Sequence, residues 1–247
     1  MLGVPYISFP VHTGVKRGLQ IGTSFPIEIY LNYSRSNMYL FNRTIETTGE
    51  MAKIIPILHD LKKAVLAAGV DATVWLGGAG YKMGTVIFTT PYENLADRAE
   101  ANTKLGASEA VMEANQKLIS YTRGVELDTI IQYLKGGTLA AAVPVGAVVS
   151  LIQSQLAQGA DWMKTLEWSM AMAELNEKIS GVTANLGFVT FGQLGGLVQF
   201  SGYANAAAAE AAREAQMASA EWMPLFLKGG EFALAGSVLS RQMTKLA

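Results

Sequence analysis

The feature that most constrains this chain is an internal repeat, because the same order of predicted elements occurs in residues 37–135 and again in residues 147–247. In each copy a strand precedes a helix that ends at a glycine-valine pair. Two strands, a second helix rich in alanine and glutamate, and a last strand follow. The spacing is nearly the same, since 23 residues separate Gly69 from Tyr92 and 22 separate Gly181 from Tyr203. A repeat of this kind predicts two copies of one β-α-β-β-α-β unit.

The composition excludes several classes of function. Half of the residues are hydrophobic and 16% are charged, which is enough apolar surface for a sizeable core and too little charge for a disordered chain. The net charge of −1, without a cluster of lysine and arginine, predicts no nucleic-acid partner. The absence of cysteine excludes disulfides, thiolate catalysis and zinc-thiolate sites.

The chain carries no signal for export or for a membrane span. Its first residues lack a basic start followed by an apolar run, so they do not resemble a signal peptide. Residues 136–160 are uncharged, but Pro144 and several glutamine and serine side chains interrupt the apolar run that a spanning helix needs. We therefore expect a cytoplasmic protein with no membrane partner.

Three segments are predicted. Residues 1–36 form an N-terminal extension with one strand at residues 25–33, where apolar and polar residues alternate. Residues 37–146 and 147–247 form the two repeats. The connection between them is short, which favours a single compact body over two separate domains.

Comparison of the two copies assigns side chains to the two faces of each strand, because side chains alternate along a strand. The positions that are mostly apolar in both copies are expected to lie beneath the helices: Val74, Leu76, Ile87, Thr89, Leu186, Phe188, Val198 and Phe200. The positions that vary in size and polarity are expected to line a cavity: Thr73, Trp75, Phe88, Thr90, Asn185, Gly187, Gln199 and Ser201.

A β-α-β-β-α-β unit forms an antiparallel sheet with both helices on one side, the ferredoxin-like arrangement. The other side is apolar here, and two copies can cover it by packing sheet against sheet. The element order, the glycine before the first helix, and Tyr92 and Tyr203 after the third strand of each copy resemble the dimeric α+β-barrel superfamily. The resemblance implies an α+β fold in which tandem ferredoxin-like repeats form, within one chain, the barrel that two subunits usually build.

The same resemblance implies a function. The superfamily includes antibiotic-biosynthesis monooxygenases, small polyketide cyclases, stress-responsive barrel proteins and haem-handling relatives, and its members commonly bind an apolar or aromatic molecule in the lumen. It implies an enzyme of secondary metabolism that performs cofactor-independent oxygenation or cyclisation of an aromatic or polyketide-like substrate, without a cofactor or a metal. The alternatives are a non-catalytic ligand-binding or stress-response barrel and a haem-binding relative.

Three polar side chains are the predicted catalytic residues. A buried amide costs free energy unless it is paired, so Asn185 and Gln199 are candidates to polarise a substrate carbonyl or to stabilise an enolate. Arg43 is a candidate partner for a carboxylate or phenolate. We place it on the first strand of its copy at the position that Gln153 occupies in the other copy. The structural alternatives are amides that bond backbone carbonyls and an arginine in a surface ion pair.

Four aromatic residues are the predicted substrate-binding residues. Trp75 could form a wall for a flat ligand and donate its indole N–H, and Phe88 lies on the same predicted face. Tyr92 and Tyr203 could act as hydrogen-bond donors at the barrel mouths. Packing in the core or at the strand-to-helix turn is the structural alternative for each of them.

Two further expectations concern histidine and assembly. His59 lies away from the apolar face of its predicted helix, so a surface position is expected and no haem or metal ligand set is evident. Residues 179–209 of the second copy carry no charge, whereas the matching part of the first copy carries five charged residues. Burial of the second copy by the N-terminal segment or by a second subunit would explain this difference, and of the two we expect a second subunit, that is, a homodimer.

Overall fold

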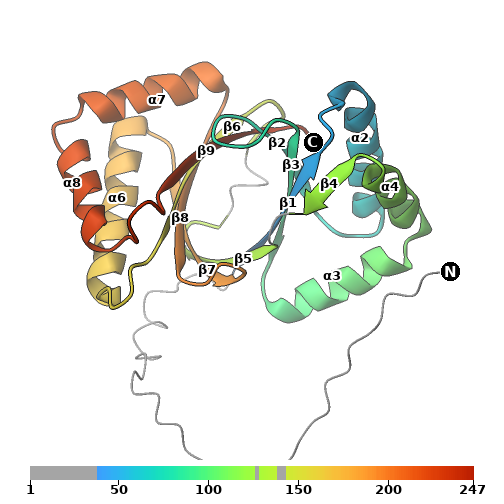
Figure 1. Cartoon of the computed structure of the whole chain (residues 1–247), viewed down its shortest axis with the longest axis horizontal. Coiled ribbons are helices and arrows are strands. Elements are labelled where there is room, and N and C mark those ends of the chain that lie inside the picture. Colours follow the sequence, from blue (N-terminus) through green and yellow to red (C-terminus); the bar gives the residue numbers. More distant parts are fainter. Residues whose placement is uncertain (1–37, 126–127, 138–142) are drawn as a thin grey trace, which may run out of the picture.

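The computed structural model describes residues 38–125, 128–137 and 143–247, and these residues form a closed β-barrel with helices on its outside (Figure 1). The predicted N-terminal strand lies outside the described residues. The first half contains β1 (Tyr39–Thr47), α2 (Met51–Ala67), β2 (Thr73–Gly77), β3 (Thr85–Tyr92), α3 (Leu95–Ala107), α4 (Glu109–Ile119), β4 (Thr122–Val125) and β5 (Thr129–Lys135).

The second half presents its elements in the same order. It contains β6 (Val148–Gln155), α6 (Trp162–Ser180), β7 (Ala184–Phe191), β8 (Gly196–Tyr203), α7 (Ala206–Ala218), α8 (Trp222–Lys228), the short 3-10 helix η1 (Gly229–Glu231) and β9 (Leu239–Lys245). The short strand β4 of the first half, which pairs with the end of β1, has no named counterpart among the described elements of the second half.

The strand pairing explains how the barrel closes. The first half forms an antiparallel sheet in the order β5-β1-β3-β2, and the second half forms the matching sheet β9-β6-β8-β7. Pairing of β2 with β9 and of β5 with β7 joins the two sheets at both sides, which closes the barrel. The α+β fold class and the barrel-like body predicted from the sequence are therefore confirmed; the residue limits of the two repeats stay a prediction.

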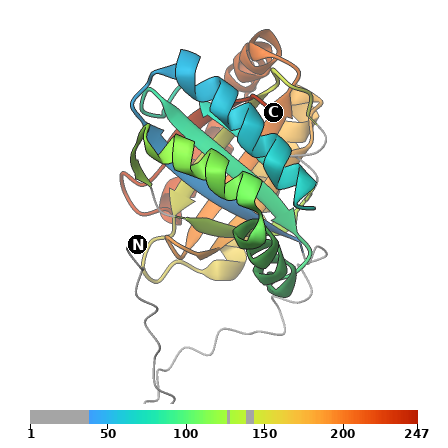
Figure 2. The same ribbon diagram turned by 90° about the vertical axis from the view of Figure 1, so that its right-hand side faces the viewer.

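Helices cover the outer face of each sheet. Helices α2, α3 and α4 lie on one flank of the barrel and α6, α7 and α8 on the other, as Figures 1 and 2 show. On the first flank Ile54, Leu58 and Leu61 of α2 are buried against Val74 and Val86 of the sheet. A separate apolar cluster lines the inside of the barrel, so most of the strands carry buried residues on both faces, which accounts for their many apolar residues.

One capping device occurs in both halves. Asn94 begins α3 and its Oδ1 accepts a hydrogen bond from the backbone N–H of Asp97 at 2.9 Å. Asn205 begins α7 and accepts in the same way from Ala208 at 2.9 Å. These caps satisfy a free N–H at each helix start, so this part of the sequence similarity between the copies reflects helix initiation.

The predicted faces of β2 and β7 agree with the structure, but those of β3 and β8 are wrong. Residues directly opposite each other in an antiparallel pair share a face, and Val74 pairs with Phe88 while Trp75 pairs with Ile87. The prediction placed Trp75 and Phe88 on one face, which is a shift of one residue, and such a shift reverses every side chain of a strand. The inner face therefore carries Ile87, Thr89, Val198 and Phe200, and the outer face carries Phe88, Thr90, Gln199 and Ser201.

The final strand also lies later than the sequence indicated. In the sequence, Gly229-Gly230 predicts that this strand occupies residues 231–239, but β9 is Leu239–Lys245 and η1 ends at Glu231. The strand has the sequence LSRQMTK, in which polar residues outnumber apolar ones, and this composition hides its period-two pattern. In the part of the chain that the structure describes, no helix is both long and apolar enough to cross a membrane.

Candidate functional site in the barrel lumen

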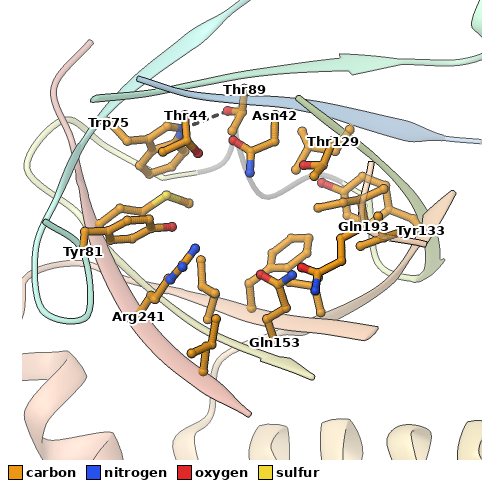
Figure 3. Close-up of a pocket in the computed structure, with 18 residues that line it drawn as sticks. Asn42, Thr44, Trp75, Tyr81, Thr89, Thr129, Tyr133, Gln153, Gln193 and Arg241 are labelled. Atoms are coloured by element: carbon orange, nitrogen blue, oxygen red, sulfur yellow. Dashed lines mark hydrogen bonds between the residues drawn. The ribbon is translucent and has the colours of Figure 1, made fainter. Parts of the chain in front are cut away.

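The candidate site is a cavity of about 160 Å³ inside the barrel (Figure 3). Its walls are mainly apolar, and polar side chains enter it from several strands. It is lined by Leu40, Asn42, Thr44, Trp75, Tyr81, Thr89, Thr129, Ile131, Tyr133, Leu151, Gln153, Val189, Gln193, Val198, Phe200, Leu239, Arg241 and Met243.

One end of the cavity lies at two strand connections that occupy matching places in the two halves. Tyr81 comes from the connection between β2 and β3, and Gln193 comes from the connection between β7 and β8. The first connection is held against the start of β9, because the N–H of Gly78 donates to the Gln242 carbonyl at 2.7 Å and the Gln242 N–H donates to the Ala79 carbonyl at 2.8 Å. The exposed Gln193 and Leu239 place the mouth of the cavity at this end.

Trp75 forms one wall, and its polar atom is already bonded. The side chain is 1% exposed, and its indole Nε1–H donates a hydrogen bond to the Thr89 hydroxyl at 2.8 Å. The residue therefore presents a fixed aromatic surface to the lumen. Its N–H, which the sequence suggested as a donor to a ligand, is used within the protein.

Arg241 brings a positive charge to the lumen. Its guanidinium carbon lies 4.9 Å from the centre of the Tyr81 ring, an arrangement in which a cation stacks on an aromatic face. Its Nε is buried and has no hydrogen-bond partner in the described protein. Figure 3 shows this side chain pointing into the cavity from β9.

Asn42 provides a polar atom on the other side of the cavity. It projects from β1 into the lumen (Figure 3), and its Oδ1 is buried without a partner among the described residues. Buried polar atoms are nearly always hydrogen-bonded in proteins, so this unpaired oxygen is a cost in stability that a functional role of the residue would explain.

Tyr133 contributes a buried phenol. The side chain is 1% exposed, and burial raises its pKa above the usual value, so it stays protonated at neutral pH. Its ring meets Phe200 edge to face, with 5.7 Å between the ring centres and an angle of 65° between the planes. This contact holds the ring in one orientation.

The structure places one of the predicted catalytic amides near the lumen and the other outside it. Asn185 lies on the same face of β7 as Val189, which lines the cavity, but at the opposite end of that strand. There its Oδ1 accepts a hydrogen bond from the backbone N–H of Gly137 at 3.0 Å. A side chain at Gly136 would approach this Oδ1 to 1.9 Å, so the glycine is required there. Gln199 lies outside the barrel, beneath the helices of the second half, because the predicted face of β8 was reversed.

Arg43 also lies outside the lumen. Its Nε and Nη2 donate to the two carboxylate oxygens of Asp128 at 2.9 and 2.7 Å, and this ion pair raises the pKa of the guanidinium. The predicted match of Arg43 with Gln153 was one residue out of register. Tyr39 lies opposite Tyr92 and Val148 opposite Tyr203, so the residue that corresponds to Gln153 is Thr44. The surface ion pair is therefore the observed arrangement for Arg43.

Of the predicted substrate-binding residues, Trp75 alone lines the lumen. Phe88 and Tyr92 lie in a cavity of the outer face beneath α3 and α4. Tyr203 lies on the outer face of the second sheet, next to α7. Burial raises the pKa of both tyrosines, and their matching positions agree with a packing role at the end of the third strand of each half.

Sequence reasoning missed most of the polar residues of the cavity. Asn42, Tyr133 and Gln153 lie on strands that were predicted, and a correct register would have placed them inside. Arg241 and Met243 were missed because β9 was placed too early in the sequence. Tyr81 lies in a glycine-rich connection, and nothing in the local sequence indicates that this connection folds over the mouth of the barrel.

Two asparagines give a matched test of this assignment. Replacing Asn185 with leucine is expected to lower the free energy of unfolding by roughly 1–3 kcal/mol, because the buried N–H of Gly137 loses its acceptor. Replacing Asn42 with leucine is expected to leave stability unchanged or to raise it, because it removes an unpaired amide oxygen. Denaturant unfolding of both variants checks this; an equal loss would show that Asn42 is a structural residue.

The described residues contain no group of three or more histidine, aspartate or glutamate side chains that could hold a metal ion. His59, the one histidine in the described ranges, is exposed on α2, as the sequence predicted. Haem also fits this lumen poorly. No histidine of the described ranges lines the cavity, and its volume is below the roughly 300–1,000 Å³ of pockets that hold drug-sized ligands.

Comparison with known proteins places the chain at the level of its fold. No family model matches the sequence, and no curated protein matches it. A protein from Fusobacterium nucleatum, named a putative monooxygenase, superposes with a TM-score of 0.62 at 9% identity. A protein named a putative chlorite dismutase superposes with a TM-score of 0.52 at 10% identity. They cover 86% and 85% of this chain, and the matches span 94% and 95% of their own lengths.

An anthrone oxidase-like protein superposes with a TM-score of 0.60 at 12% identity, over 86% of this chain and 92% of its own. The chain has the dimeric α+β-barrel fold. The identities are too low to carry over an activity, so the shared feature is the closed barrel, and the resemblance seen in the sequence is confirmed for the fold alone.

Proposed function

We propose that the barrel lumen is the active site of an enzyme that acts on a small aromatic substrate. The observation that carries this proposal is the lining of the cavity. Aromatic walls from Trp75, Tyr81 and Phe200 surround buried polar atoms of Asn42 and Arg241 that have no partner in the described protein. A mainly apolar pocket with a few convergent polar groups is the usual form of a small-molecule site.

The volume favours a substrate with a single ring. A cavity of about 150 Å³ in another protein binds benzene, and this lumen measures about 160 Å³. A polycyclic or polyketide-like substrate, as the family resemblance implied, would need a larger lumen. Within the proposed function we therefore favour oxygenation of a single-ring substrate over cyclisation of a long chain.

The proposed reaction is oxidation by molecular oxygen. The substrate loses a proton from an acidic C–H next to a carbonyl or phenol, and the resulting enolate reacts with dioxygen. A CH₂ group and O₂ give a C=O group and water, so the substrate supplies all the electrons. The Tyr133 phenol and the amide N–H of Asn42, both from residues that line the cavity, are the proposed hydrogen-bond donors to the enolate oxygen, and these bonds would lower the free energy of the enolate.

A non-catalytic binding barrel is the second candidate, and one observation favours it. The residues lining the described lumen include no aspartate, glutamate or histidine, so no general base is evident. Oxygenation would then require a substrate acidic enough to lose its proton to water. A protein that only holds an aromatic ligand needs no such group.

The experiment that tests the proposal is oxygen uptake with a panel of single-ring phenols and aryl ketones that carry an acidic C–H. We expect uptake that depends on the protein, with one atom of ¹⁸O₂ in the product and the other in water, detected by mass spectrometry. Ligand binding without uptake would favour the binding barrel. If no compound of the panel binds and none causes oxygen uptake, the lumen is not an aromatic site.

A further inference from the structure

We infer that the lumen selects anionic ligands, and that Arg241 is the residue that determines this specificity. The inference deepens the proposed function, on which it rests, by naming the substrate class: a single aromatic ring that carries a carboxylate or a phenolate. It follows from the charge balance of the cavity, from the contacts of Arg241 and from a contrast with two other arginines of the chain.

The charge balance of the cavity is one-sided. Among the described residues that line it, Arg241 carries the one formal charge, and no acidic side chain lies with it. Arg241 forms no ion pair within the described protein. A cation that is partly removed from water is normally paired, because desolvation of the charge costs free energy that a partner must offset. The missing partner is therefore expected to come from the ligand.

The contacts of Arg241 hold its guanidinium at the wall of the cavity, where a ligand can supply such a partner. The face of the group lies over the Tyr81 ring at 4.9 Å, which fixes its plane. Its Nε is buried and unpaired, and the side chain points into the cavity (Figure 3). A guanidinium whose plane is fixed in this way suits a carboxylate, which accepts two parallel hydrogen bonds from it.

Arg43 shows how this chain treats a guanidinium that serves structure. Arg43 also lies over an aromatic ring, Phe41, at 5.6 Å, but Asp128 accepts two hydrogen bonds from its edge. No carboxylate of the described protein takes the place on Arg241 that Asp128 takes on Arg43. Arg43 has its carboxylate within the protein, whereas a carboxylate for Arg241 has to come from a ligand.

The size of the cavity limits what can bring that carboxylate. At about 160 Å³ it accommodates one ring with a small substituent. Trp75, Phe200 and Tyr81 provide the ring contacts, and Asn42 points toward the cavity from the wall opposite β9 (Figure 3). An aromatic acid such as benzoate therefore matches the lumen in shape and charge, and benzamide has the same shape without the charge.

The test compares benzoate and benzamide by calorimetry on the wild-type protein and on Arg241→Met and Arg241→Lys. Methionine keeps an apolar stem and removes the charge; lysine keeps the charge without the planar edge. We expect benzoate to bind at least about tenfold more tightly than benzamide to the wild type, and Arg241→Met to weaken benzoate about tenfold to a hundredfold. Benzamide binding should change little, and Arg241→Lys should lie between the two.

Arg98→Met is the matched control. Arg98 lies over the Phe41 ring at 4.8 Å and its Nε is also buried and unpaired, but it lines a cavity on the outer face of the barrel. We expect this variant to bind benzoate as the wild type does. An equal loss in Arg98→Met and Arg241→Met would overturn the inference, because a general effect of net charge would explain both.

The remaining outcomes separate the two proposals. Equal affinity for benzoate and benzamide would overturn selection by charge and leave an aromatic site in the lumen. If neither benzoate nor benzamide binds, that result would contradict both the proposed function and the selection of anionic ligands. If Arg241→Met does not fold, Arg241→Lys decides: unchanged benzoate binding in that variant would show that the planar edge is not used.

Discussion

Replacing Tyr133 with phenylalanine is expected to reduce turnover about 100- to 1,000-fold, the usual loss when one donor to a developing oxyanion is removed. The phenol is buried at 1% exposure, and its raised pKa keeps it protonated, so it can donate a hydrogen bond over the whole neutral range. Steady-state oxygen uptake with the best substrate of the panel measures this. An unchanged rate would remove Tyr133 from the proposed mechanism.

Stability should change little in this variant, by about 1 kcal/mol or less, because no hydrogen bond from the Tyr133 hydroxyl to the described protein is broken. The wild type should be stable up to about pH 10 and lose stability as pH rises further, because ionisation of a tyrosine whose folded pKa is raised favours the unfolded state. The Tyr133→Phe variant should therefore lose less stability above about pH 10 than the wild type does.

Tyr203→Phe is the control for this experiment. Burial also raises the pKa of Tyr203, but its hydroxyl interacts with Ser201, Ser180 and Gln216 outside the lumen. We expect this variant to lose roughly 1 kcal/mol of stability and to keep its turnover. Opposite responses of the two variants would separate a role in the site from a role in packing.

Replacing Trp75 with alanine is expected to lower the free energy of unfolding by about 3–5 kcal/mol, the usual cost of removing a large buried aromatic side chain. Trp75 lies on β2, the strand that joins the first half to the second through β9, so the loss affects one of the two seams that close the barrel. Denaturant unfolding measures the change. A loss below about 1 kcal/mol would mean that the neighbouring side chains refill the space.

Trp75→Phe provides the control. It keeps an aromatic wall and removes the hydrogen bond to Thr89, so we expect a loss of roughly 1 kcal/mol beyond the effect of the smaller ring. The alanine variant should also enlarge the lumen. Larger aromatic acids that the wild type rejects should therefore bind to Trp75→Ala, and failure to bind them would show that Trp75 does not limit the size of the ligand.

The fold could be predicted because it follows from repeated local signals. Gly181 adopts the left-handed conformation that ends α6, and Asn94 and Asn205 cap matching helices. Two units of the same order, each with an apolar inner face, have few ways to bury that face. Packing the two sheets into one barrel is the simplest of them, and the structure has it.

The site could not be predicted to the same extent, because its residues depend on register and on long-range pairing. Whether Phe88 or Ile87 faces the lumen depends on a shift of one residue between β2 and β3, which alternation within a single strand does not reveal. The role of Arg43 depends on Asp128, which is 85 residues away in the sequence. Arg241 enters the site because β9 crosses to pair with a strand of the other half.

The sequence by itself determined the order of elements that both halves share and the aromatic residue at position 75, because these properties arise from residues near one another in the chain. Tertiary structure alone decided which polar atoms enter the lumen and which are left without a partner. Asn185 and Asn42 are both asparagines on strands, yet the Oδ1 of Asn185 accepts a hydrogen bond from Gly137 and the Oδ1 of Asn42 is buried without a partner among the described residues. That difference is set by neighbours from distant segments, since an amide's free energy depends on the partner that the fold brings to it.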